Sequence, residues 1–155
     1  MNHIDIDNKK KNILIINTKR QKQSYIVYQY LKNTYPDTDM VESVSYDIEH
    51  ICKLLSQYKV CIDIDNYYNV LLANACGAYG ITAAQTFDKN IIKVLNYEEI
   101  IGIIPELLSA NTKEANNIRE DVIKKYDWDT FGVNIQNHIK NIITKDFIVW
   151  SERLM

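Results

Sequence analysis

Short apolar runs alternate along this chain with longer stretches in which apolar residues recur at helical spacing. The pattern predicts five strands, over residues 12–17, 40–45, 59–64, 78–83 and 91–95. It also predicts six helices, over residues 24–35, 47–57, 67–76, 97–108, 112–126 and 130–143. Strands that alternate with helices in this order form right-handed β-α-β units. We therefore expect an α/β fold, a single Rossmann-like domain over residues 12–143 whose parallel sheet carries helices on both faces.

Residues with special backbone preferences set several helix ends. Asp47 is a typical N-cap residue at the start of the second predicted helix. Gly77 follows the third, at the position where a left-handed residue commonly ends a helix. Pro105 lies inside the fourth, and because proline has no N–H to donate, we expect that helix to break near Ile104.

The composition indicates one ordinary globular domain. The chain has 155 residues, of which 25% are charged, and its formal net charge is -2. This balance argues against a protein that coats nucleic acid, so no nucleic-acid partner is expected. No apolar run reaches the roughly 18 residues of a membrane-spanning helix, so no membrane span is expected. Residues 1–11 are polar and charged, which predicts a solvated or disordered tail rather than a secretory signal.

Three cysteines, Cys52, Cys61 and Cys76, each lie inside an apolar run. Their spacing is not that of metal ligands, so we expect no metal site. An odd number of buried thiols is typical of proteins from a reducing compartment, and we expect three reduced cysteines in a cytoplasmic protein.

Several common chemistries lack their motif at the ends of the predicted strands. No G-x-G-x-x-G follows the first strand, and no G-x-x-x-x-G-K-[ST] or G-x-S-x-G occurs in the chain. The acidic pair that a phospho-acceptor receiver domain needs after its first strand is also missing. These absences argue against a dinucleotide fingerprint, a P-loop nucleotidase and a serine hydrolase.

A cluster of cations follows the first predicted strand. Lys19, Arg20 and Lys22 lie where the carboxyl ends of parallel strands meet, which is the ligand-binding edge of open α/β sheets. Cations there suit a phosphate, and arginine can hold one with two hydrogen bonds. The alternative is a solvated basic loop without a ligand.

A second polar cluster follows the third predicted strand at the same edge. Asp65 and Asn66 begin the next helix, and Asn69 lies in its first turn. The backbone N–H groups at such a helix start attract anions, and the amides can bind a diphosphate or sugar hydroxyls. The alternative is that Asp65 or Asn66 only caps the helix.

The segment VLLANACGAYGIT, residues 70–82, resembles the v-L-E-A-m-A-c-G-x-p-v-i-t segment of GT-B glycosyltransferases. The resemblance is to their C-terminal, donor-binding Rossmann-like domain. Three further segments are similar to that domain in the same order: INTKRQKQ at 16–23, VLNYEEIIGIIPELL at 94–108, and KKYDWDTFGVNIQNHI at 124–139. Together they cover most of residues 12–143.

The resemblance implies transfer of a sugar from a nucleotide-sugar, with no cofactor and no bound metal. Arg20 and Lys22 match the cations that hold the donor diphosphate in this family. The family's E-x7-E pair is not matched, because Ile64 and Leu72 stand at those positions. Asp63 or Asp65 could replace the first carboxylate by a one-residue slip, and Asn74 could offer an amide near the second. The alternative function is a non-catalytic module that binds a nucleotide or a partner protein.

No match to the family's acceptor-binding domain is present, so no catalytic residue is assigned and the isolated chain is not expected to transfer sugar. Residues 144–155 form an amphipathic segment with much apolar surface, including Trp150. We expect this segment to bury itself in an oligomer or against a partner protein.

Overall fold

A computed structural model describes residues 9, 11–45, 47–86, 88–110 and 112–125. Its centre is a sheet of five strands that all run in parallel, in the order β2-β1-β3-β4-β5. The strands are β1 (Lys11–Ile16), β2 (Thr38–Val41), β3 (Tyr58–Ile62), β4 (Tyr79–Thr82) and β5 (Ile92–Lys93). The predicted α/β fold with one Rossmann-like domain and a five-stranded parallel sheet is confirmed.

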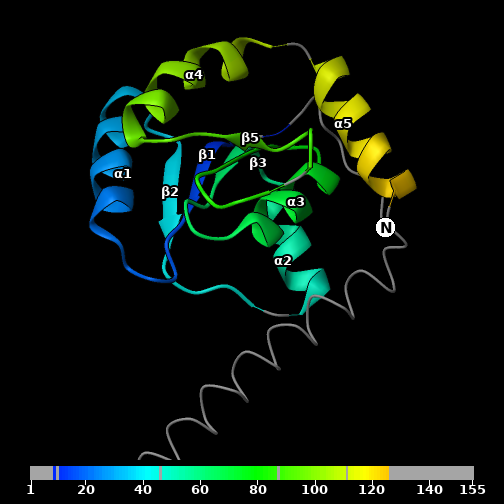
Figure 1. Cartoon of the computed structure of the whole chain (residues 1–155), viewed down its shortest axis with the longest axis horizontal. Helices are drawn as coiled ribbons and strands as arrows, with labels where there is room; N and C mark the ends of the chain where they lie inside the picture. Colours follow the sequence, from blue (N-terminus) through cyan, green and yellow to red (C-terminus); the bar gives the residue numbers. More distant parts are fainter. Residues whose placement is uncertain (1–8, 10, 46, 87, 111, 126–155) are drawn as a thin grey trace, which may run out of the picture.

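Helices cover both faces of this sheet (Figure 1). They are α1 (Lys22–Thr34), α2 (Ile48–Leu55), α3 (Tyr67–Ala75), α4 (Tyr97–Ser109) and α5 (Thr112–Lys125). Helices α1 and α4 cover one face, and α2 and α3 cover the other, where α5 packs against α3. The predicted helix 130–143 and the segment 144–155 lie outside the described residues.

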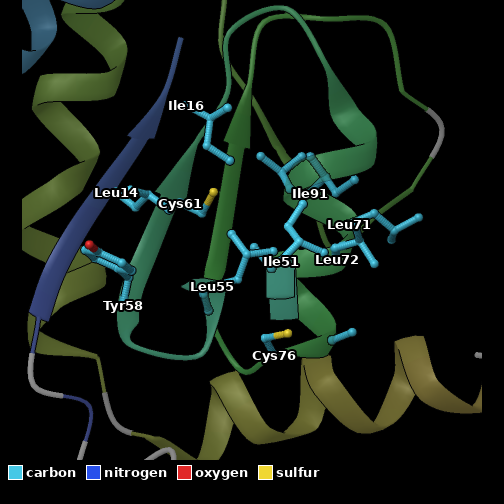
Figure 2. Packing of buried hydrophobic residues seen from close by; sticks show 14 of the residues in the cluster. Leu14, Ile16, Ile51, Leu55, Tyr58, Cys61, Leu71, Leu72, Cys76 and Ile91 are labelled. Atoms are coloured by element: carbon cyan, nitrogen blue, oxygen red, sulfur yellow. The ribbon is translucent and has the colours of Figure 1, made fainter. Parts of the chain in front are cut away.

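Strand β1 shows why the sheet needs cover on both sides. Ile13 and Ile15 point into the cluster under α1 and α4, while Leu14 and Ile16 point into the cluster under α2 and α3. All four side chains are almost fully buried. A strand buried on both faces gives a continuous apolar run, which is why residues 12–17 were recognisable as a strand. Figure 2 shows the cluster under α2 and α3, which contains Leu14 and Ile16.

Helix α3 has the ends that the sequence predicts. The side chain of its N-cap, Asn66, accepts a hydrogen bond from Tyr68 N at 2.8 Å. At the other end Gly77, which follows the C-cap Cys76, has a φ of 81°, in the left-handed region that favours glycine.

The predicted break near Ile104 is wrong. Helix α4 continues through Pro105 to Ser109. Pro105 is exposed, so water can bond to the carbonyl that its missing N–H leaves free. Ile100, Ile104 and Leu107 are buried on the opposite side, and packing of this apolar face on both sides of the proline holds the helix together.

Strand β2 starts and ends earlier than the predicted 40–45. Thr38 already pairs with Ile13, and its buried hydroxyl donates to the carbonyl oxygen of Tyr35 at 2.7 Å. The strand ends at Val41, whose carbonyl accepts a hydrogen bond from Asn17 N. Within the described part of the chain, no helix combines the length and apolarity needed to cross a membrane.

Candidate functional site

The strand order creates one special position at the carboxyl edge of the sheet. From β1 the chain passes through α1 to β2 on one side of the sheet, and from β3 it passes through α3 to β4 on the other side. Strands β1 and β3 are therefore neighbours, and the helices that follow them cover opposite faces. Ile15 lies opposite Ile62, so both strands end at nearly the same level. Ligands of open α/β sheets bind outside such a topological switch point. The loops that flank it are 17–21 and 63–66.

Asn17 shapes the first of these loops. Its buried side chain accepts a hydrogen bond from Gln21 N at 2.8 Å and donates to Gln21 O at 3.3 Å. Arg20 N donates to Asn17 O at 3.2 Å, and Arg20 has a φ of 51°, which is uncommon for a residue with a side chain. The loop is therefore held in a tight turn by one amide side chain.

The three predicted cations Lys19, Arg20 and Lys22 are brought together at this turn, and all are exposed. Lys22 is the first residue of α1. Arg20 Nε lies 3.4 Å from an oxygen of Glu42, which follows β2, and the arginine side chain remains 73% exposed. An ion pair this exposed contributes little, so it leaves the guanidinium available to a stronger anion.

Asp63 is the central residue of the second loop. It directly follows β3, is 2% exposed, and accepts hydrogen bonds from Asn69 Nδ2 at 2.8 Å and from Asp65 N at 3.2 Å. Burial raises the pKa of the Asp63 carboxyl to about 6, although the hydrogen bond from Asn69 acts in the opposite direction. The Asn69 amide therefore hydrogen-bonds to Asp63, and Asn69 is buried rather than open to a ligand.

Asp65 and Asn66 lie nearer to the solvent than Asp63 and Asn69 do. Asn66 caps α3, as the alternative interpretation of this polar cluster predicted. The aromatic rings of Tyr67 and Tyr68, which follow it, stack on each other with centroids 4.3 Å apart. This second loop therefore offers oxygen and amide groups, and the first loop offers cations.

Asn74 does not join the other predicted residues. It lies near the opposite end of α3, is fully buried, and its amide oxygen and nitrogen have no hydrogen-bond partner among the described residues. The helix approaches β4 closely there, because a Cβ on Gly80 would lie 3.3 Å from Asn74 Oδ1. The structure gives no physical reason for this buried amide.

Ile64 and Leu72, which stand where the resembled family has its Glu pair, are 8% and 1% exposed. Both belong to the hydrophobic core. Apolar, buried side chains at these two positions cannot do the work of the carboxylate pair.

Sequence reasoning missed two residues of this edge, Asn17 and Glu42. A buried asparagine that closes a strand is a recognisable turn signal, so Asn17 was open to prediction. Glu42 was not, because its pairing with Arg20 depends on β2 lying beside β1.

A shallow hollow lies elsewhere, between the last turn of α4 and the first turns of α5. Most of the residues that line it are exposed, and they carry mixed charges, including Glu106 and Lys113. No group of three or more His, Cys, Asp or Glu side chains that could hold a metal occurs among the described residues. No protein-family model and no curated protein matches this sequence.

Proposed function

We propose that this domain binds the diphosphate of a nucleotide-sugar at the switch point between β1 and β3, as the donor half of a glycosyltransferase. The observation that carries the proposal is the juxtaposition of a cationic turn at residues 19–22 and an oxygen-rich helix start at residues 65–66 on adjacent strands. A diphosphate suits the first group, and sugar or ribose hydroxyls suit the second.

In this role Arg20 and Lys22 stabilise the charge that the leaving diphosphate gains. The bond between the anomeric carbon and the phosphate oxygen breaks, and its electron pair stays on the diphosphate. The acceptor oxygen forms the new bond, and its proton goes to a base on the acceptor-binding partner. Asp63 stays outside this chemistry, because its oxygens already accept hydrogen bonds from Asn69 and the α3 loop.

A second function is favoured by one observation, the core positions of Ile64 and Leu72. Without a carboxylate pair the domain would bind a nucleotide without transferring sugar. Comparing the affinity for a nucleoside diphosphate with that for the matching nucleotide-sugar separates the two functions. A donor domain gains affinity from the sugar, and a nucleotide-binding module does not.

Replacing Arg20 with glutamine should weaken binding of UDP, GDP or ADP about ten-fold or more, because a charge-assisted hydrogen bond to phosphate is lost. Glu42→Gln should act in the opposite direction, since Glu42 pairs with Arg20 in the free protein. Isothermal titration calorimetry measures both changes.

The matched control is Lys53→Gln, which removes one positive charge from an exposed residue in the last turn of α2, at the opposite edge of the sheet. It should leave affinity unchanged. Equal losses in Arg20→Gln and Lys53→Gln would show a general charge effect and would contradict a site at the β1 loop.

A further inference from the structure

The turn that carries the three cations depends on one buried side chain, that of Asn17. Asn17 is 2% exposed, and its backbone is fixed to β2 because Asn17 N donates to Val41 O at 2.8 Å. The amide oxygen of Asn17 accepts from Gln21 N at 2.8 Å, and the amide nitrogen donates to Gln21 O at 3.3 Å. The carbonyl oxygen of Asn17 accepts from Arg20 N at 3.2 Å. One residue therefore supplies the backbone and side-chain hydrogen bonds that close the turn.

Arg20 has a backbone conformation that is unusual for a residue with a side chain. Its φ is 51°, and among the described residues other than glycine no second positive φ occurs. This left-handed region is unfavourable for a residue with a Cβ, and glycine adopts it without that penalty. An arginine persists there only where the surrounding contacts impose the conformation, and here the hydrogen bonds of Asn17 do so.

The contacts of the Arg20 side chain do not explain why an arginine occupies this strained position. Its side chain is 73% exposed, and Nε lies 3.4 Å from one oxygen of Glu42. The other oxygen of Glu42 accepts a hydrogen bond from the Tyr25 hydroxyl. An ion pair this exposed contributes little to stability, so it does not offset the strain. Strain that stability does not explain is typical of residues kept for function.

We propose that Asn17 is a positioning residue, which holds the turn in the conformation that presents Arg20 to the diphosphate. The role rests on the proposed function, because it concerns the phosphate contact that Arg20 makes there. Without the Asn17 amide, the turn would exchange with conformations in which residue 20 has an ordinary negative φ and its guanidinium points elsewhere. The apparent affinity for the ligand then falls with the fraction of molecules whose turn is still competent to bind.

The first test is a double-mutant cycle on the full chain, with Asn17→Ala, Arg20→Gln and the combined variant, titrated with UDP, GDP and ADP by calorimetry. Asn17→Ala should weaken binding roughly five-fold when Arg20 is present. It should have no effect in the Arg20→Gln background, because the contact that Asn17 positions is already lost. A residue with a merely structural role would weaken binding in both backgrounds.

Two further observations keep the cycle interpretable. The Gln21 amide should exchange faster with solvent in Asn17→Ala than in the wild type, because its hydrogen bond to the Asn17 side chain is gone. If the alanine variant does not fold, Asn17→Ser provides the cycle, since a serine hydroxyl can accept the same hydrogen bond more weakly. Its loss of affinity should be smaller and should again require Arg20. Equal losses in both backgrounds, or no loss in either, would overturn the positioning role.

The second test needs no ligand and measures the strain at Arg20. Arg20→Gly should raise the urea midpoint of unfolding, because glycine adopts the left-handed conformation without a steric clash. The matched control is Lys19→Gly, which removes the same charge from the neighbouring exposed residue, whose φ is not positive. This control should lower the midpoint, since glycine there only adds freedom to the unfolded chain. A fall of the midpoint in both variants would overturn the strain at Arg20 and with it the proposal.

The outcomes distinguish a failure of this role from a failure of the proposed function. If the wild type binds none of the three diphosphates, or if Arg20→Gln binds as tightly as the wild type, the diphosphate site itself is wrong and the role of Asn17 falls with it. If Arg20→Gln weakens binding but Asn17→Ala acts equally in both backgrounds, the site stands and only the role of Asn17 is wrong.

Discussion

Replacing Gly80 with alanine should lower the free energy of unfolding by about 3 kcal/mol, the upper part of the range for overpacking a core. A Cβ at this position in β4 would lie 2.8 Å from both the Cβ and the carbonyl oxygen of Val70 in α3. One of those atoms belongs to the backbone, so the helix itself would have to move away from the sheet. Urea unfolding of the full chain measures the change.

Gly102 provides the matched control for this substitution. It lies inside α4, and a Cβ there would meet nothing within 4 Å. Gly102→Ala should therefore raise the free energy of unfolding by about 0.5–1 kcal/mol, the usual gain for alanine over glycine in a helix. If both variants shifted stability in the same direction, the close approach of α3 to β4 would be wrong.

The second large effect concerns Asp63, whose folded-state pKa is about 6. The unfolded carboxyl titrates near 3.9, so between roughly pH 4 and pH 6 the folded state holds more protons than the unfolded state. The contribution of Asp63 to stability therefore falls as pH rises through this window. Above this pH window, the ionised and buried Asp63 lowers the free energy of unfolding by on the order of 3 kcal/mol.

The measurement compares wild type with Asp63→Asn by urea unfolding from pH 4 to pH 8. Asn69 can turn its amide oxygen toward the new side chain, so the buried hydrogen bond can be kept. The wild type should lose stability relative to the variant as pH rises. A difference that stays constant with pH would show that Asp63 is not a buried, ionising carboxyl.

Asp39 gives the opposite sign and serves as the control. A hydrogen bond from Tyr58 lowers the pKa of Asp39, with a smaller effect from Lys11. Its stabilising contribution is present at neutral pH and is lost as pH falls through its folded pKa. The free energy of unfolding of the wild type should therefore increase relative to that of Asp39→Asn as pH rises.

The fold could be predicted from the sequence because each strand and helix has a recognisable local sequence pattern. The run ILII in β1 is apolar on both faces, Asn66 and Gly77 mark the ends of α3, and the alternation of strands and helices leads to a parallel sheet. Pro105 was misleading because propensity acts on one residue, while packing of α4 acts along the whole helix.

The candidate site could be predicted only in part, for a physical reason. Position after a strand was enough to find Lys19, Arg20, Asp65 and Asn66 at one edge of the sheet. Which of these polar groups already pair within the protein depends on contacts between segments that are apart in the sequence. Asn69 donates a hydrogen bond to Asp63, and Arg20 forms an ion pair with Glu42.

The most direct test of a ligand site at the switch point is amide NMR of the isotope-labelled full chain titrated with UDP, GDP and ADP. The proposed site predicts that the largest saturable shift changes fall on residues 18–22 and 65–68, from the two loops that flank β1 and β3. Amides near Cys76 and Gly77, at the other edge of the sheet, should stay unchanged. Changes that cluster at that other edge, or no saturable change with any of the three diphosphates, would contradict the account.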